Sequence, residues 1–389
     1  MITLKKTPFM FFLISSIAFD TALSLQPDLN AYSNIFKGGL MVIFMIPTVA
    51  LLLRKSTYAS IDILALLLLT VIFIYYSALS EFPADSMNRA LKQLFLVSIY
   101  SAAIYYLHYS PFRRKDLVNL TIVCLMISSP AALFLTFNPR VDHVVQDAAP
   151  YTVLSLLMLS FLVAKNNNRF LIVLMLLASF VLMTIMKRGA ILTLALIIIY
   201  WSILQNFYFP RGRTFAKTLF WAVVSALVIS VFWFVRGDDF ILRLQDYSGS
   251  GRDLIYMSIL QGIIDSNTAE LLFGHGSMAV QILTGQTIGV RESAKFGLQS
   301  HNDWLTLSYD FGLFGIFLFV IFHFAIYKKI QAFKKIDTSL YVKLKPIHLA
   351  IIAISFFSEI LFNTSLIFIY VLLAITSSPA KFSSAINAR

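Results

Sequence analysis

The feature that most constrains this chain is a succession of long apolar runs joined by short polar connections. Most runs are about 17 to 25 residues long, the length an α-helix needs to cross a hydrocarbon core of about 30 Å. Because 59% of the 389 residues are hydrophobic and only 13% are charged, these runs dominate the sequence. The pattern predicts an all-α polytopic membrane protein, in which residues 1–389 form a single integral membrane domain.

We predict about twelve membrane spans. Those before the last apolar stretch lie at residues 8–25, 36–53, 60–79, 90–107, 117–137, 148–164, 169–186, 189–207, 215–235 and 302–327. The last stretch, 346–377, is too long for one crossing, and we divide it into two helices near Asn363. Residues 236–301 then form a long hydrophilic loop between the ninth and tenth spans, where we expect the function to reside.

Basic residues in the short connections predict the orientation. If Lys5 and Lys6 are cytoplasmic, alternation of the spans places most connections rich in Lys and Arg on that side, together with both termini. The 236–301 loop then lies outside. The outward-facing cations gather at one short turn and in this loop, at Lys187, Arg188, Arg236, Arg243, Arg252, Arg291 and Lys295. The net charge of +12 therefore gives no sign of a nucleic-acid partner.

Lys187 and Arg188 interrupt the apolar stretch 169–207, in the sequence TIMKRGAIL. At the centre of one helix, two cations would cost roughly 5 to 7 kcal/mol, and the stretch is too long for one crossing. We therefore predict a helical hairpin that turns outward at Lys187, Arg188 and Gly189. A guanidinium at headgroup depth can bind a phosphate or pyrophosphate bidentately. The alternative is that both cations merely extend to the membrane interface.

Two segments of the loop have the S-x-x-D spacing of a helix N-terminal cap. One begins at Ser250 and contains Arg252, and the other begins at Ser300, contains His301 and ends at Asp303. Each cap would place its cationic or titratable residue in a first helical turn, where free N–H groups favour anions. His301 could accept a proton from an attacking hydroxyl, since its unperturbed pKa of about 6.5 is close to neutrality. Arg252 as a surface cation and His301 as a structural histidine are the alternatives.

Other polar residues fit more than one interpretation. His275, between Gly274 and Gly276, either shapes a binding site or belongs to a structural turn. The acidic residues Asp20 and Glu359 are expected within spans, where they serve either function or polar packing. The scattered histidines and a single cysteine do not form a metal-binding pattern, and no phosphate-binding or dinucleotide motif is found.

Taken in order, KRGAIL, SGRDLIYMSIL, GHG and HNDWLTLSYDFGLFG resemble motifs of the bacterial O-antigen polymerase and O-antigen ligase superfamily. The resemblance covers residues 180–320, and hydropathy alone supports the rest. It implies a GT-C-like fold and an inner-membrane glycosyltransferase that acts at the periplasmic face without cofactor or metal. It also implies that donor and acceptor are glycans carried on undecaprenyl pyrophosphate, and that a chain-length regulator is a further partner.

Carried over by position, the resemblance implies that Arg188 and Arg252 bind the leaving pyrophosphate and that His301 orients or deprotonates the acceptor hydroxyl. Further expected substrate-binding residues are Lys187, Arg243, His275, Arg291, Asn302 and Asp303. The HND sequence favours a polymerase that joins repeat units over a ligase that transfers finished chains to the lipid A core. A lipid-linked-sugar flippase is the alternative outside these enzymes.

Overall fold

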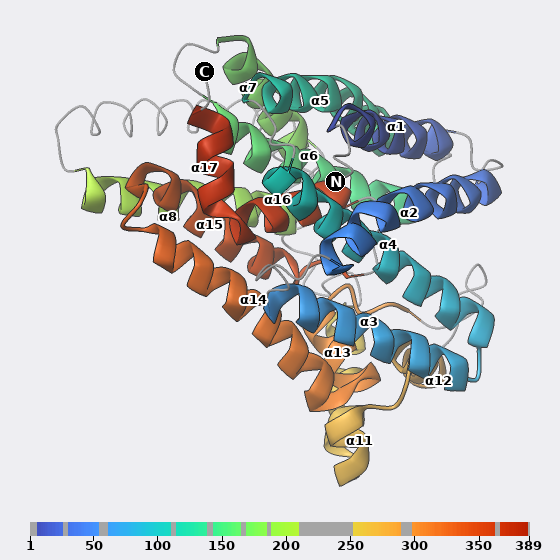
Figure 1. Ribbon diagram of the computed structural model, residues 1–389. Coiled ribbons are helices and arrows are strands. Elements are labelled where there is room, and N and C mark those ends of the chain that lie inside the picture. Colours follow the sequence, from blue (N-terminus) through green and yellow to red (C-terminus); the bar gives the residue numbers. More distant parts are fainter. Residues whose placement is uncertain are drawn as a thin grey trace.

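The computed structural model describes residues 6–25, 30–53, 61–109, 114–137, 143–164, 169–184, 188–209, 252–288, 298–361 and 366–387. Within these ranges all regular secondary structure is helical and no strand is found (Figure 1). Five of the described helices are long and apolar enough to cross a membrane. The described part of the chain is thus almost entirely helical, in agreement with the all-α membrane protein that the sequence predicts.

Eight helices precede the long loop in the described part of the chain. They are α1 (Lys6–Leu25), α2 (Asn30–Leu53), α3 (Ile61–Leu79), α4 (Pro83–Tyr109), α5 (Arg114–Phe137), α6 (His143–Val163), α7 (Arg169–Thr184) and α8 (Arg188–Tyr208). Each coincides with one of the predicted apolar runs. Proline begins α4, which suits a first helical position because that residue has no intrahelical partner for its N–H. The helices α7 and α8 flank the predicted turn, but residues 185–187 lie outside the description.

The loop and the C-terminal part contain further helices, most of them shorter. They are α10 (Arg252–Ile264), α11 (Thr268–Phe273), α12 (Ala279–Thr287), α13 (Asp303–Asp310), α14 (Gly312–Phe333), α15 (Thr338–Ile354), α16 (Ile367–Ser377) and α17 (Pro379–Asn387). The predicted single helix over 302–327 is wrong, because the chain divides into α13 and α14 at Phe311 and Gly312. Gly312 has φ +63, a conformation that ends one helix and begins another in a new direction.

Two further predictions concern the last apolar stretch and the span before the long loop. The stretch 346–377 is interrupted, since α15 ends at Ile354 and residues 355–361 form a turn before α16. The predicted span at 215–235 lies outside the described residues.

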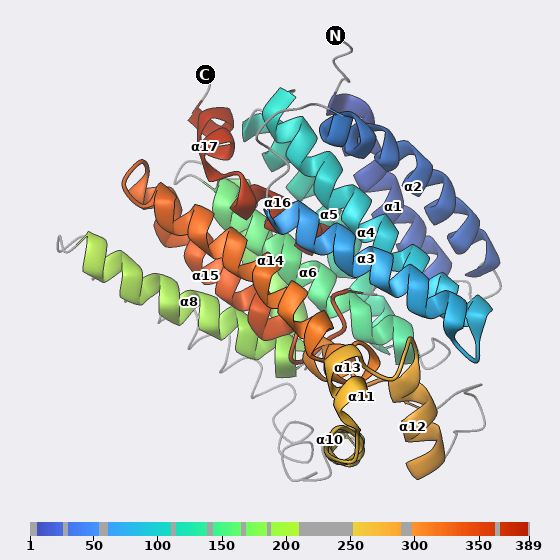
Figure 2. The same ribbon diagram turned by 60° about the horizontal axis from the view of Figure 1, so that its bottom comes forward.

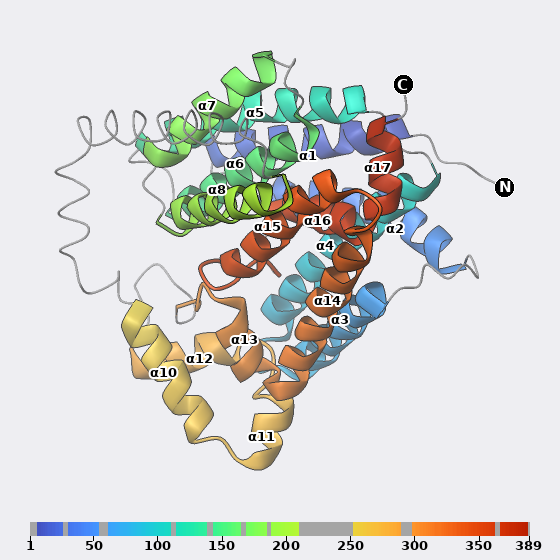
Figure 3. The ribbon, with the colours of Figure 1, turned by 90° about the vertical axis from the view of Figure 1, so that its left-hand side faces the viewer.

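The short helices of the loop gather at one end of the bundle (Figures 2 and 3). There α3 ends and α4, α13 and α14 begin, and we call this the loop end. Tyr76 of α3 donates a hydrogen bond from its hydroxyl to the carbonyl of Phe273, at 2.7 Å. Ser80 donates to the carbonyl of Ser277, at 3.3 Å. These contacts attach the loop directly to the connection between α3 and α4.

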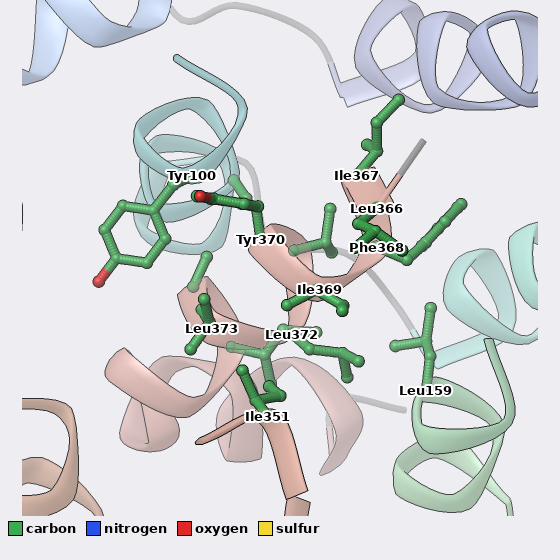
Figure 4. Packing of buried hydrophobic residues seen from close by; sticks show 14 of the residues in the cluster. Tyr100, Leu159, Ile351, Leu366, Ile367, Phe368, Ile369, Tyr370, Leu372 and Leu373 are labelled. Carbon is green, nitrogen blue, oxygen red and sulfur yellow. The ribbon is translucent and has the colours of Figure 1, made fainter. Parts of the chain in front are cut away.

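The core of the bundle is organised around α4 and α16. α4 packs against α2, α3 and α16, while α16 also packs against α6, α14 and α15. Every residue of α16 is buried, and its side chains reach Tyr100 of α4, Leu159 of α6 and Ile351 of α15 (Figure 4). A helix that is apolar on all sides is stable where it is surrounded by protein.

The outer helices carry apolar side chains on their outward faces as well. In α3 the outward apolar side chains are Ile61, Leu64, Leu68, Val71, Tyr75 and Leu79. The opposite face of the same helix buries Leu66, Leu69 and Phe73. α8 and α14 have outward apolar residues of the same kind. In water such stripes would form large exposed apolar patches, whereas a lipid environment accommodates them.

Candidate functional site

The GHG turn and the end of α13 are joined through their backbones. The N–H of His275 donates to the carbonyl of Tyr309, and the N–H of Gly276 donates to the carbonyl of Asp310, each at 2.9 Å. Gly274 has φ +81, and a Cβ there would overlap the backbone of Asp310 and Phe311. The glycine of this motif is therefore required by close backbone approach as well as by its φ.

Asp310 holds the same loop through its side chain. Its Oδ1 accepts a hydrogen bond from the N–H of Val280 at 2.8 Å, and its Oδ2 accepts one from Met278 at 3.3 Å. Met278 itself has φ +70 and precedes α12. The carboxylate thus satisfies N–H groups at the beginning of α12 that have no intrahelical acceptor. Asp310 is fully buried, so these contacts lie inside the protein.

The cap of α13 differs from the one that the sequence predicts. Asn302, not Ser300, is the N-cap, and its Oδ1 accepts from the N–H groups of Trp304 at 2.9 Å and Leu305 at 3.1 Å. His301 has φ +52, which turns the chain so that the helix begins at Asp303. His301 therefore precedes the helix rather than lying in its first turn, and the predicted cap at Ser300 is wrong.

Asp303 binds the 355–361 turn. Its Oδ2 accepts from the N–H of Ile360 at 2.9 Å and its Oδ1 from Leu361 at 3.3 Å, while its own N–H donates to the carbonyl of Ser355 at 2.9 Å. The indole of Trp304 donates to Oγ of Ser355 at 2.7 Å. Asp303 is completely buried, and its bonds fix the segment around His301 against the 355–361 turn.

The same turn lies against the beginning of α8. A Cβ placed on Gly189 would come within 2.9 Å of Cβ of Phe357 and 2.5 Å of the hydroxyl of Tyr151. That hydroxyl donates to the carbonyl of Phe357 at 3.4 Å. The first turn of α8, which begins at Arg188, is therefore next to the turn that binds Asp303. Two sequence motifs separated by more than a hundred residues meet at the loop end.

A cluster of buried charges joins α4 to both motifs. Nη1 of Arg89 lies 3.0 Å from Oδ2 of Asp310, and its Nη2 lies 3.7 Å from Oε1 of Glu359. Glu359 belongs to the 355–361 turn. We call Arg89, Asp303, Asp310 and Glu359 the Arg89 cluster, because electrostatic interactions link the four groups. Arg89 thereby connects the GHG turn, through Asp310, with the segment around His301.

Among the described residues the cluster contains one guanidinium and three carboxyl groups, and burial shifts the pKa of two of these carboxyls. Burial raises the pKa of Asp310 to about 6, and Arg89 opposes this rise. Burial, followed by the charge of Glu359, raises the pKa of Asp303 well above its usual range, although two backbone N–H groups favour its ionised form. Asp303 and Asp310 both lie outside the apolar helix Gly312–Phe333, which follows them in the chain. Perturbed carboxyl groups of this kind are typical of functional sites, and of structural ion-pair networks too.

Two hydroxyl groups complete the surroundings of Glu359. Oγ of Ser300 and Oγ1 of Thr306 lie 2.6 Å apart, and both approach Oε1 of Glu359, at 3.4 and 3.3 Å. Ser300 is also bonded to Asn302. The residues on both sides of His301 are therefore fixed by buried contacts.

Of the remaining predicted site residues, the structure describes some and not others. Arg252 begins α10, and this helix packs through Ile255 and Ile259 against a small cluster that includes Tyr309 and Leu305. Arg252 thus lies on a helix beside the His301 segment. Arg188 begins α8, and its side chain lies outside the description. Lys187, Arg243 and Arg291 lie outside the described residues as well.

His275 is exposed at the surface of the loop. Its ring stacks on Tyr309 with centroids 4.2 Å apart, its Nε2 lies 2.7 Å from Oγ of Ser266, and its Nδ1 lies 4.0 Å from Glu270. These contacts explain how the GHG turn is supported from outside. They favour the structural interpretation of His275 over the substrate-binding one.

Sequence reasoning did not identify Arg89 or Asp310 as site residues. The available signal for Arg89 was its position at the outward end of a predicted span, where the positive-inside rule disfavours an unneeded cation. Asp310 stands in the DFGLFG segment of the resemblance, but no role was attached to it. Glu359 was noted as an intramembrane acid of open function, and the structure places it in the turn at the loop end.

The chain matches no protein-family model and no curated protein. Within the described residues, no group of three or more His, Cys, Asp or Glu side chains is arranged to hold a metal ion. The interpretation of the site therefore rests on its residues and their geometry.

Proposed function

We propose that this protein is an inner-membrane glycosyltransferase that polymerises O-antigen or related surface polysaccharide repeat units at the periplasmic face. Its donor and acceptor are glycans carried on undecaprenyl pyrophosphate. One observation carries the proposal: the 355–361 turn contacts both Gly189, in the KRGAIL motif, and Asp303, in the HND motif. This contact supports a shared site formed by regions that the sequence alone could relate only by resemblance.

The proposed reaction uses three residues. The acceptor hydroxyl oxygen attacks the anomeric carbon of the donor, and its proton passes to His301. The new glycosidic bond forms as the bond to the pyrophosphate oxygen breaks, and the electron pair leaves with the pyrophosphate. Arg188 and Arg252 neutralise the negative charge that develops there, and fixed charges of this kind can be worth several kcal/mol in the transition state.

The finer architecture belongs to the same proposal. We infer about twelve spans, a GT-C-like arrangement and cytoplasmic termini, with the loop end facing the periplasm. The all-helical fold and the apolar outward faces of α3, α8 and α14 support a membrane location. A chain-length regulator is the partner that this role implies.

Deletion of the gene, followed by electrophoresis of the lipopolysaccharide, tests the function. A polymerase deletion leaves core carrying one repeat unit. Bare core with accumulated lipid-linked polymer would instead indicate the ligase, and lipid-linked single units on the cytoplasmic side would indicate a flippase. A normal ladder would overturn all three.

Single substitutions test the site. Arg188→Ala, Arg252→Ala and His301→Ala should each lower chain extension about a hundredfold or more, since positioned acid–base and charge-stabilising groups contribute effects of this size. Lys335→Ala, which removes an exposed cation at the opposite end of the bundle, is the matched control and should extend normally. Membrane insertion of each variant is checked by immunoblot. A normal ladder from an inserted variant would remove that residue from the mechanism.

A further inference from the structure

The two carboxylate oxygens of Glu359 are held differently. Oε1 lies 3.4 Å from Oγ of Ser300 and 3.3 Å from Oγ1 of Thr306, two hydroxyls that also contact each other, and Nη2 of Arg89 lies 3.7 Å from it. Oε2 receives no hydrogen bond or ion pair from the described residues. It is also not one of the fully enclosed polar atoms that lack a partner, so it reaches the protein surface. One oxygen is thus fixed and the other is open.

Glu359 is otherwise enclosed, since its side chain is 9% exposed. Burying a carboxylate is costly unless the charge is compensated, and Arg89 is shared with Asp310 and Glu359. The protein thus maintains a partly compensated carboxylate at a point where a smaller or neutral side chain would pack with less cost. A binding role for the open oxygen accounts for this arrangement.

The surroundings of Glu359 are the proposed reaction site. Its turn touches Gly189 on one side, through Phe357, and binds Asp303 on the other. Ser300 and Thr306, which contact Oε1, stand on either side of His301. A group bound at Oε2 would therefore lie between the start of α8 and the His301 segment.

Sugar hydroxyl groups are suitable ligands for such an oxygen. A hydroxyl donates to an ionised carboxylate in a short, charge-assisted hydrogen bond, stronger than one between neutral groups. Because Oε1 is already anchored, little side-chain freedom is lost when Oε2 receives its ligand. A pyrophosphate, in contrast, would be repelled by the carboxylate.

We propose that Oε2 of Glu359 binds a hydroxyl group of the acceptor sugar, with Arg89, Ser300 and Thr306 holding the carboxylate in place through Oε1. This inference rests on the proposed glycosyltransferase function and divides its site in two. The arginines bind the pyrophosphate of the donor, and Glu359 binds the acceptor glycan beside His301.

The test measures glycan extension by the full-length protein in lipid nanodiscs, with lipid-linked repeat units extracted from the host as substrate. Glu359→Gln keeps the shape of the side chain but places a donor or a neutral acceptor at Oε2. It should raise the KM for the repeat unit about tenfold to a hundredfold, the loss expected for one hydrogen bond to a charged group. Inhibition by added undecaprenyl pyrophosphate should remain unchanged. Glu359→Asp, which withdraws the carboxylate by one methylene group, should give an intermediate KM.

Asp62→Asn is the matched control, because Asp62 is a buried carboxylate at the opposite end of the same helix layer. It should leave both constants unchanged in the folded protein. An unchanged KM in Glu359→Gln would overturn the acceptor role, as would a parallel weakening of undecaprenyl pyrophosphate inhibition, which indicates general damage. If Glu359→Gln does not fold, the KM of Glu359→Asp tests the acceptor role instead, and an unchanged KM in that variant would overturn it. A wild-type protein that extends no repeat unit would instead overturn the proposed function.

Discussion

Two charged clusters lie at opposite ends of the layer formed by α3, α4 and α14, and they are built differently. At the far end, Nζ of Lys329 lies 2.8 Å from Oδ1 of Asp62, and the hydroxyl of Tyr100 donates to Oδ2 of the same carboxylate. We call these three residues the Asp62 cluster. In this cluster both oxygens of Asp62 are bonded, one of them to a cation. In the described part of the Arg89 cluster one base faces three acids, and Oε2 of Glu359 receives no hydrogen bond from the described residues.

The difference distinguishes a purely structural ion pair, the Asp62 cluster, from a candidate binding site, the Arg89 cluster. A balanced cluster ties helices together and has no capacity left for a ligand. The cation of the Arg89 cluster is also more enclosed, at 12% exposed against 31% for Lys329, and buried charge that is not compensated is costly inside a protein. Its position beside the predicted reaction residues supplies a reason for it.

Arg89→Ala should have the largest effect on stability. It leaves Asp310 and Glu359 without their cation, and removal of one partner from a buried ion pair typically costs about 3 to 5 kcal/mol. Chemical unfolding of the purified protein in detergent measures the loss. The double variant Arg89→Ala with Asp310→Asn should recover part of it, because the coupled pair is removed together. If the double variant is as unstable as the sum of the single ones, the two residues are not coupled.

The stability of the protein should depend on pH through Asp310. Its pKa of about 6 in the folded protein exceeds the ordinary value of 3.8, so folding favours the protonated carboxyl. Its contribution to stability is complete below pH 3.8 and is lost as pH rises through 6. The loss amounts to about 3 kcal/mol, at 1.36 kcal/mol per pKa unit. Unfolding of wild type and Asp310→Asn, compared from pH 4 to pH 8, should give diverging curves. Parallel curves would contradict the assignment.

Lys329→Met tests the balanced cluster. It removes the cation from Asp62 but leaves the hydrogen bond from Tyr100, and Lys329 is partly exposed. We expect a loss of about 2 kcal/mol, the size of one hydrogen bond between charged groups. Glycan extension per folded molecule should be unchanged. A selective loss of extension without a loss of stability would show that the far end also takes part in the function.

Thr306→Val should have the smallest effect. It keeps the shape of the side chain but removes a hydroxyl that contacts Ser300 and Glu359. A neutral hydrogen bond contributes about 1 kcal/mol, so the free energy of unfolding should fall by that amount. Thr121→Val is the matched control, since Thr121 is a buried threonine whose hydroxyl donates to the carbonyl of Leu117 in its own helix. Equal losses in both variants would mean that the contact with Glu359 adds nothing.

Sequence reasoning predicted the helical architecture well because long apolar runs have few alternatives. It missed the division between α13 and α14, because the apolar run continues through Phe311 and Gly312 while φ +63 at the glycine redirects the chain. It also assigned the cap of α13 to Ser300, since nothing in the local spacing reveals that His301 adopts a positive φ. Local pattern does not encode how a tertiary contact sets the start of a helix.

The site was predicted in part for a similar reason. The motifs around His301 and Gly189 could be identified by their residues, but their meeting depends on the 355–361 turn, which contains no motif of its own. Arg89 could not be assigned, because its partners Asp310 and Glu359 are more than two hundred residues away in sequence. Pairing over such distances is decided by how the helices pack.

The seam between the GHG turn and α14 has a mechanical consequence. Gly274 and Gly312 face each other so closely that a side chain on either would overlap the backbone of the opposite segment. Two backbone hydrogen bonds from the GHG turn to the end of α13, directly before Gly312, close the seam. The GHG turn is therefore rigidly coupled to α14. If that helix tilts in a thinner or thicker bilayer, the turn moves with it. Membrane thickness then becomes a variable that acts on the geometry of the loop end.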